Sequence, residues 1–206
     1  SMDYGFKDLK NPNAYNPERS KQLLAEDGWK DTDGDGILDK DGKPLTFDFV
    51  VYNSRAELPL YAEAVQADLK KVGIDMKIKS VDYNLIDKMG QDGDYDMLIS
   101  NIVTANTGDP IWFLANYWHT NVDGSNPQNG SGYSNPQVDQ LLDAAETEFD
   151  PAKRRDYAIQ IQQLLMNDGA ALFLGYPKTN IVTGSYLKGA VMYPSDYYWI
   201  TNKITK

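Results

Sequence analysis

Residues 45–52 read LTFDFVVY, and residues 74–81 read IDMKIKSV. Both stretches are rich in β-branched and aromatic residues, a composition typical of β-strands. Between them, residues 56–72 carry apolar side chains at helical spacing and are followed by Gly73, a common helix-ending residue. A strand, a helix and a second strand in this order predict a βαβ unit, whose two strands are parallel and whose crossover is right-handed. The sequence therefore predicts an α/β fold.

Asn-Pro and Asp-Pro pairs divide the rest of the chain. They occur at 16–17, 109–110, 135–136 and 150–151. Each pair places a capping side chain before a proline suited to the first position of a helix. We expect helices after Pro17, Pro136 and Pro151, the first ending at Gly28 and the last at Gly169. The apolar runs YDMLISNIV at 95–103 and AALFLGY at 170–176 predict two further strands.

The composition excludes several classes of function. The chain has 206 residues, a net charge of -10 and no cysteine. No basic patch offsets this charge, so a nucleic-acid partner is not expected. The absence of cysteine excludes disulfides, thiolate metal sites and cysteine nucleophiles. There is no apolar run long enough to span a membrane and no signal peptide, and the opening Ser1-Met2 resembles a tag remnant, so we expect a piece of a longer protein.

Residues 31–43, DTDGDGILDKDGK, concentrate carboxylates in a short loop. The pattern resembles the first half of an EF-hand calcium loop, but its twelfth position is Gly42 in place of glutamate. The loop predicts a structural calcium site that holds the link between the first helix and the strand starting near Leu45. Its expected ligands are Asp31, Asp33, Asp35 and Asp39, with Asp41 and a backbone carbonyl near Ile37 as helpers. The alternative interpretation is a solvated acidic turn, because Asp-Gly pairs also form turns.

Residues 104–135 form a long connection rich in asparagine, glycine and aromatic residues. It follows a predicted buried strand, and ligands of open α/β sheets bind beyond the carboxyl ends of strands. Trp118, His119 and Tyr133 are therefore candidate ligand-binding residues on an ordered loop. We expect Trp112 and Phe113 to be core residues of a short helix.

The sequence does not indicate an enzyme. His119 is the only histidine, and neither a G-x-S-x-G elbow nor a phosphate-binding glycine loop is present. A zinc site built mainly on imidazoles is excluded by this count. A hydrolase is the least favoured hypothesis.

Five segments, taken in order, resemble the family 5 extracellular solute-binding proteins, which are receptors of ABC importers for oligopeptides, dipeptides and nickel. The resemblance extends from about Tyr15 to Tyr176. The segments are YNPERSKQLLAEDGWKDTDGDGILDKDGKPLTF at 15–47, AEAVQADLKKVGIDMKI at 62–78, GDYDMLIS at 93–100, DPIWFL at 109–114 and GYSNPQVDQLLDAAETEFDPAKRRDYAIQIQQLL at 132–165.

The resemblance implies a periplasmic-binding-protein-like lobe with a mixed, partly parallel sheet flanked by helices. Residues 1–182 would form the C-terminal ligand-binding lobe of a two-lobed receptor, and residues 183–206 would return to an N-terminal lobe that this chain lacks. The aromatic segment YPSDYYW at 193–199 would then be uncovered or packed on a neighbour. Such a receptor acts outside the cell membrane, in the periplasm or on a lipid anchor, and delivers its ligand to a permease.

The resemblance also bears on the ligand. Peptide-binding members carry an aspartate three residues before the acidic-Pro pair, where it receives the peptide α-ammonium group; this chain has Asn106 there. An amide cannot supply that charge-assisted bond. The nickel branch also lacks the aspartate and has a histidine after its DPxxFL stretch, nearly where His119 lies, although the spacing is a few residues short and Thr104 and Gly108 replace that branch's aromatics. We therefore expect a nickel or nickel-chelate receptor with His119 as a nickel ligand. A peptide receptor, a calcium-fastened interaction module and an ordinary surface histidine remain alternatives.

Overall fold

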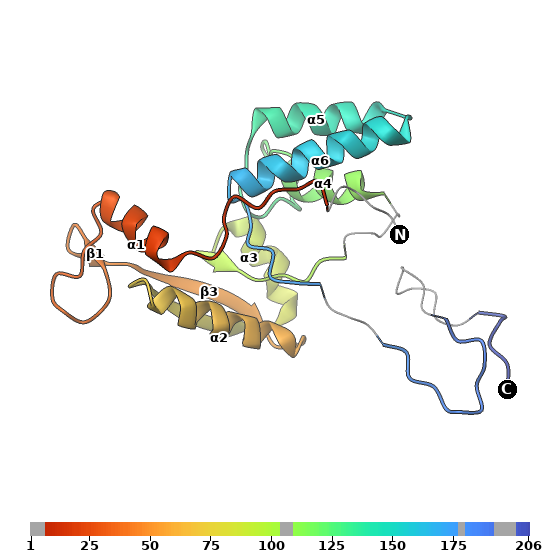
Figure 1. The fold of residues 1–206 in the computed structure, drawn as a ribbon, viewed down its shortest axis with the longest axis horizontal. Coiled ribbons are helices and arrows are strands. Elements are labelled where there is room, and N and C mark those ends of the chain that lie inside the picture. The colour runs from red at the N-terminus through yellow and green to blue at the C-terminus, as the bar shows by residue number, and fades with distance from the viewer. Residues whose placement is uncertain (1–6, 104–108, 177–179, 192–200) are drawn as a thin grey trace.

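The computed structural model describes residues 7–103, 109–176, 180–191 and 201–206 (Figure 1). Within them, two separate hydrophobic cores form. We call the part around the first core, residues 45–99, the sheet half. The part around the second core, residues 109–170, is the helical half.

The sheet half is built on β3 (Thr46–Tyr52), which lies between β4 (Asp75–Val81) and β5 (Met97–Leu98). Both strand pairs are parallel. Helix α2 (Glu57–Lys70) connects β3 to β4 and packs on the sheet, as Figure 1 shows. This arrangement confirms the predicted βαβ unit. The last four residues of β3 are all buried, because a central parallel strand has no solvent-facing side.

Gly73 ends the turn after α2 with a φ of +83°. A Cβ added there would lie 2.6 Å from Cγ of Leu38, and the Leu38 N–H donates to the carbonyl of Gly73 over 2.8 Å. The end of the acidic loop is therefore held against the βαβ unit at a position where only glycine fits.

Two strand predictions are wrong in extent or type. Of the expected strand 95–103, only Met97–Leu98 is a strand, with one further bond from the Ile99 N–H to the carbonyl of Val50. The stretch 170–176 forms no strand within the described residues, because none of them pairs with it along its backbone. Leu174 still packs on the first core, whereas Leu172 and Tyr176 are exposed.

The helical half consists of α4 (Pro110–Trp118), α5 (Pro136–Thr147) and α6 (Pro151–Asn167). All three begin at an Asn-Pro or Asp-Pro pair. The side chains of Asp109, Asn135 and Asp150 each accept from a backbone N–H in the first turn. The helices predicted after Pro136 and Pro151 are confirmed, and so is the one after Pro17, which is α1 (Pro17–Glu26).

The remaining elements are a hairpin, a 3-10 turn and a short helix, whose Ile86 is buried in the first core. A hairpin of β1 (Asp39–Lys40) and β2 (Lys43–Pro44) follows the acidic loop, and η1 (Tyr83–Leu85) leads into α3 (Ile86–Asp92). The N-terminal segment runs along α6, where the Lys10 backbone exchanges two hydrogen bonds with the Gln163 side chain, of 2.8 and 2.9 Å.

The described C-terminal residues, 180–191 and 201–206, form an arm that extends away from both halves (Figure 1). Lys188 and Thr205 pair within it. The aromatic segment 193–199 lies outside the described residues, so its predicted exposure and the assignment of 183–206 to a second lobe stay predictions. In the described ranges, no helix combines the length and the apolar composition needed to cross a bilayer.

Candidate ligand-binding site

His119 lies directly after the last residue of α4, with oxygen atoms on both sides of its ring. Nε2 is 3.3 Å from Oδ1 of Asp143, and Nδ1 is 3.3 Å from the carbonyl oxygen of Thr120 and 3.6 Å from Oδ1 of Asp139. A carbonyl and a carboxylate can only accept, so both ring nitrogens are best used as donors. The surroundings of His119 therefore suit the imidazolium form.

Opposing effects act on the pKa of His119. Partial burial lowers it, but the hydrogen bonds to Thr120 and Asp143 and the charges of Asp139 and Asp143 together raise it above its ordinary value. A metal is bound by neutral imidazole. Nickel binding at His119 would thus be favoured by higher pH and would displace one of these oxygen contacts.

The loop 119–135 is tied down at several points. The Thr120 backbone N–H and hydroxyl donate to the two oxygens of Asp139 over 2.9 and 2.6 Å. Asn129, which is only 3% exposed, donates from its amide nitrogen to the carbonyls of His119 and Tyr133 over 2.9 and 2.8 Å. The expectation that this segment is ordered agrees with these contacts.

Trp118 differs from the expected loop residue, whereas Tyr133 lies on the loop as expected. Trp118 is the last residue of α4 and not part of the loop, and it is 8% exposed in the second core. The spacing of Ile111, Leu114 and Trp118 on one helix face is the sequence signal for this burial. The Trp118 indole Nε1 has no hydrogen-bond partner among the described residues. A ligand-binding role for Trp118 remains a prediction.

Tyr133 packs edge-on against Trp118, with ring centroids 5.8 Å apart. Its hydroxyl donates to Oδ2 of Asp168 over 2.6 Å, and Asn135 donates to the same oxygen over 2.8 Å. Burial, together with the Asp168 carboxylate, raises the pKa of Tyr133 to about 12. Tyr133 therefore fastens the end of the loop to the end of α6.

Asn106, with Thr104 and Gly108, lies outside the described residues. The neighbouring Asp109 caps α4 and pairs with Arg154 at the start of α6. Arg154 also donates to the carbonyls of Ala145 and Glu148 at the end of α5. Sequence reasoning missed this residue, because an arginine in a first helical turn does not reveal which distant carbonyls it reaches.

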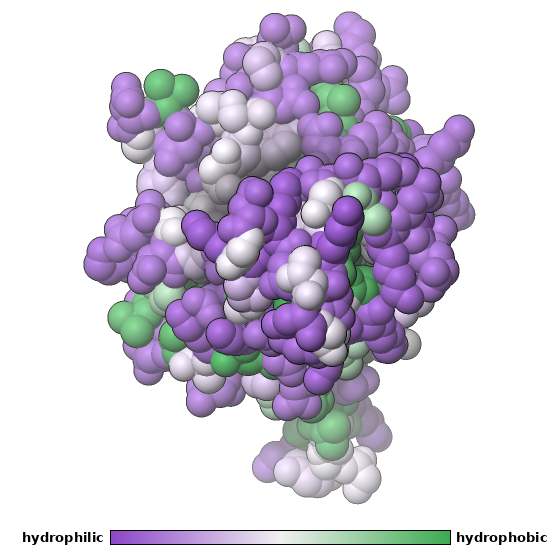
Figure 2. All heavy atoms as spheres, turned by 90° about the vertical axis from the view of Figure 1, so that its left-hand side faces the viewer, coloured by the Kyte–Doolittle hydropathy of each residue, from purple (hydrophilic) through white to green (hydrophobic). Residues whose placement is uncertain are grey.

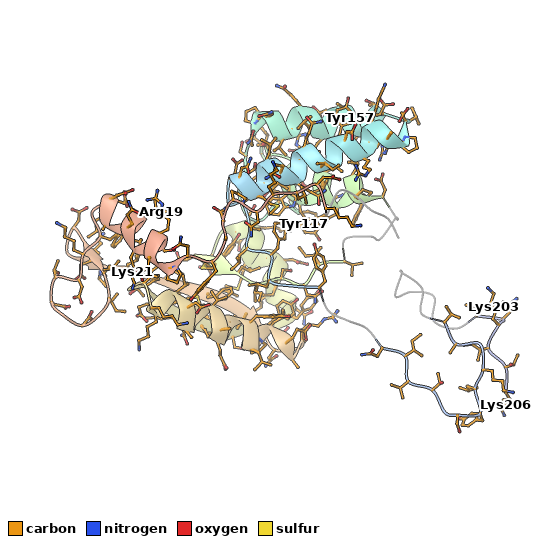
Figure 3. The ribbon with its side chains drawn as sticks, viewed as in Figure 1. Arg19, Lys21, Tyr117, Tyr157, Lys203 and Lys206 are labelled. Carbon is orange, nitrogen blue, oxygen red and sulfur yellow. The ribbon has the colours of Figure 1, made fainter. Side chains whose placement is uncertain are left out.

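One hollow adjoins His119, and the carboxyl ends of the strands lie elsewhere, in the sheet half. An open hollow of about 300 Å³ is lined by Ala115, Asn116, His119, Ser125, Asn126 and Glu146. At the carboxyl ends of the strands, the rings of Tyr52 and Tyr83 are 5.1 Å apart, and the Asn101 N–H donates to the Tyr52 hydroxyl over 3.1 Å. Tyr117 of α4 lies on the side of that helix that faces the sheet half (Figure 3).

Three of the five aspartates of the acidic loop gather. Asp31, Asp33 and Asp39 each offer an oxygen, and these oxygens lie within 4.8 Å of one another; it is the one such acidic or histidine group found among the described residues. Asp31, Asp33 and Asp39 also accept hydrogen bonds from within the loop. Asp35 is outside this group and its Oδ1 accepts from the Ile37 N–H over 2.7 Å, and Asp41 occupies the β1–β2 turn with a φ of 53°. The loop lies at the end of the molecule that faces the viewer in Figure 2, where hydrophilic residues dominate. Hard oxygen donors of this kind suit calcium.

Comparison with known proteins identifies the family. The family described as bacterial extracellular solute-binding proteins, family 5 (middle), matches residues 1–125. The chain belongs to the family 5 extracellular solute-binding proteins. Members of the family are non-enzymatic transport receptors, which confirms the expectation that this chain is not an enzyme.

Individual family 5 relatives bind different ligands. The oligopeptide-binding protein AppA of Bacillus subtilis is 31% identical over 87% of this chain and 33% of its own length. Its solved structure, in complex with a nonapeptide, superposes with a TM-score of 0.69 over 80% of this chain and 32% of that one. The nickel-binding protein NikA of Staphylococcus aureus is 26% identical over 92% of this chain and 36% of its own length. Its structure with Ni(L-His)2 gives a TM-score of 0.66 at 27% identity, over 82% of this chain and 33% of that one.

These structural neighbours confirm the predicted α/β lobe of the periplasmic-binding-protein type. The chain spans about a third of the length of the curated relatives it matches. The family therefore includes proteins named for peptides and proteins named for nickel, and similarity by itself does not choose between them.

Proposed function

We propose that this chain is the C-terminal ligand-binding lobe of a substrate-binding component of an ABC importer. The receptor acts outside the cytoplasmic membrane, free in the periplasm or lipid-anchored, and delivers its ligand to the permease. Family membership supports this function, together with coverage of only about a third of the relatives' length.

The observation that carries the proposal is the carboxyl edge of the parallel sheet, where apolar side chains that follow β4 and β5 are partly exposed. Tyr83 and Leu85, which follow β4, are 55% and 49% exposed, and Val103, which follows β5, is 38% exposed. Ligands of open α/β sheets bind at this edge. Apolar side chains at such an edge are suited to contact with a ligand and with a second lobe that closes over it.

We further propose nickel or a nickel chelate as the ligand. The uncharged amide of Asn106 cannot form an ion pair with a peptide α-ammonium group, and His119 is the one imidazole in the chain. The similarity to the Staphylococcus aureus protein solved with Ni(L-His)2 supports this ligand class. Oxygen atoms lie 3.3 Å from both ring nitrogens of His119, so a metal must displace one of them. A chelate that already supplies most of the metal's ligands needs only one bond from this residue, whereas a bare ion needs more protein ligands.

A peptide is the second candidate. The 31% identity to AppA over 87% of the chain favours it. The hydrogen bonds of His119 in this structure are compatible with peptide binding, since they need not break.

Calorimetric titration of the full-length two-lobed protein separates the two candidates. The titrants are NiCl2, preformed Ni(L-His)2 and short peptides, each at pH 6 and pH 8. The nickel proposal expects tight binding of the chelate, stronger at pH 8 because deprotonated His119 is the ligand, and its loss in His119→Ala. Ser125→Ala, which changes the same hollow without removing a metal ligand, is the matched control. Tight peptide binding with no response to nickel would overturn the nickel proposal and establish the second candidate.

We propose in addition that the acidic loop binds calcium through Asp31, Asp33 and Asp39, with Asp35 and Asp41 as helpers. The gathering of three carboxylates supports this role, which is to hold α1 to the sheet half.

Calcium at 100 times its Kd should raise the Tm of chelator-treated protein by about 5–10 °C. The rise should disappear in Asp33→Asn and persist in Asp123→Asn, an exposed aspartate of another loop. An unchanged melting curve in excess calcium would show that the loop is a solvated acidic turn. A calcium-fastened interaction module would show the same rise but no small ligand for the full-length protein.

A further inference from the structure

The helical half approaches the sheet half at Tyr117 of α4, which lies on the side of its helix that faces the sheet (Figure 3). Burial raises the pKa of Tyr117, and so do the charges of Asp87 and Tyr83 of the sheet half. The other principal meeting point is the backbone of the loop 119–135. There, Gly130 lies directly against Gly90 of α3.

The contact between the two glycines is not symmetric. A Cβ added at Gly130 would lie 3.1 Å from both the carbonyl carbon and the Cα of Gly90, and 3.2 Å from its oxygen. These are backbone atoms of a helix and cannot turn aside. A Cβ added at Gly90 would meet only the Cα of Gly130, at an ordinary 3.9 Å. The backbone of neither residue is in the left-handed region, so the cost of a side chain at Gly130 comes from this tight contact, which would force the loop and α3 apart by a few tenths of an ångström.

Hydrogen bonds also hold the loop at Gly130, one from the sheet half and others from within the loop. The Tyr95 hydroxyl, whose ring packs on the first core, donates to the carbonyl of Gly130. One residue earlier, Asn129 closes the loop by donating to the carbonyls of His119 and Tyr133. The Ser131 hydroxyl donates to Oδ1 of Asn129 over 2.8 Å, so the buried amide is held on both sides.

We propose that Asn129 and Gly130 form the joint that positions the loop 119–135 on the sheet half. Asn129 fixes the shape of the loop, and Gly130 fixes its place, because the missing side chain lets the loop backbone reach Gly90 and the Tyr95 hydroxyl. Neither residue needs to contact a ligand. Both are positioning residues, since the loop is held at its two ends by α4 and α5 and at its middle by this joint.

Hydrogen exchange of the 206-residue chain tests the joint with a matched pair of substitutions. Gly130→Ala should lower Tm by roughly 3–10 °C and speed amide exchange in residues 120–134 by about tenfold or more, because the loop must move off α3. Gly90→Ala adds the same methyl group to the other side of the contact. It should leave loop exchange unchanged and raise Tm slightly, since alanine is the better helix former in α3.

Tyr95→Phe keeps the chain's sterics and removes only the hydrogen bond to Gly130, so it carries the test if Gly130→Ala does not fold. It should speed loop exchange severalfold while β3 amides keep their protection. Equal effects of Gly130→Ala and Gly90→Ala would overturn the proposal. So would a uniform loss of protection over both halves in Tyr95→Phe, which would show general destabilisation and no local joint.

A consequence for ligand affinity rests on the proposed function. In the full-length receptor, Tyr95→Phe should lower the affinity for the ligand identified by titration and should also speed amide exchange in the loop. Faster loop exchange with unchanged ligand affinity would support the joint but would show that the loop does not contribute to ligand binding. Absence of any ligand for the unmodified receptor would instead count against the proposed function alone.

Discussion

All three helices of the helical half begin at an Asn-Pro or Asp-Pro pair, whereas α2 of the sheet half follows Ala56 with no side-chain cap. The helical half thus carries its helix starts in its local sequence. The sheet half depends on pairing between strands that lie far apart in the chain, such as Phe49 with Met97 and Thr46 with Asp75. Its local signals are the apolar runs, the turn at Gly73 and the cap of η1 by Asp82.

This difference predicts which half unfolds more easily. Local caps specify where helices start, but the three helices are held together by their shared core and by side-chain contacts such as those of Arg154. The sheet half has a continuous backbone ladder from β4 to β5 through β3. We therefore expect the helical half to lose protection first when either is weakened.

The largest effect is expected from emptying the helical core. Ile161→Ala removes a fully buried side chain and should lower the free energy of unfolding by about 2–5 kcal/mol. Hydrogen exchange should show lost protection in α5 and α6, with β3 retained. Leu23→Ala, on the exposed side of α1, is the control and should change stability by less than about 1 kcal/mol. Equal loss of protection in β3 would show that the two halves unfold as one unit.

Arg154→Gln should lower the free energy of unfolding by about 1–3 kcal/mol. The substitution removes the ion pair with Asp109 and leaves two carbonyls at the end of α5 without this donor. Urea denaturation measures the change. The neighbouring Lys153→Gln breaks only an exposed 3.4 Å pair with Glu148 and should cost at most about 0.5 kcal/mol. Similar values for the two variants would mean that Arg154 does not join the three helices.

Tyr133→Phe should lower the free energy of unfolding by about 1–2 kcal/mol at pH 7, since it removes a hydrogen bond to an ionised carboxylate. The pKa of Tyr133 is raised to about 12, above an unfolded value of about 10. This contribution is therefore complete below about pH 10 and is lost as pH rises toward about 12. Urea unfolding at pH 7 and pH 11 should show the two proteins converging, whereas Tyr157→Phe, on the face of α6 in the same core (Figure 3), should show no such convergence.

His119→Gln should have the smallest effect and lower the free energy of unfolding by about 0.5 kcal/mol, because its partner Asp143 is exposed. The pKa of His119 is raised in the folded state, so its contribution is complete below the unfolded value of about 6.5 and is lost as pH rises through the folded value. The difference between the two proteins should be larger at pH 5.5 than at pH 8.5. A difference that grows with pH would indicate that His119 is neutral in the folded protein.

Part of the fold and of the candidate site could be predicted from sequence. The caps at Asn16, Asn135 and Asp150 and the βαβ unit 45–81 act through neighbours in the chain or through simple apolar runs, and they are found where expected. The run 170–176 has the composition of a strand, but a strand also needs a partner edge, which composition does not reveal. The clustering of Asp31, Asp33 and Asp39 could be expected from their spacing, whereas the turning away of Asp35 could not.

By itself, the sequence determined the α/β class, the helix starts, the family and the residues from which a site is built. Only the tertiary structure decided how those residues are used. It buried Trp118, placed two oxygens on the ring of His119, and brought Gly130 against Gly90, 40 positions earlier in the chain. The physical reason is that caps and periodicity depend on residues a few positions apart. Burial, pKa and close backbone contact depend on whichever distant segments the fold brings together.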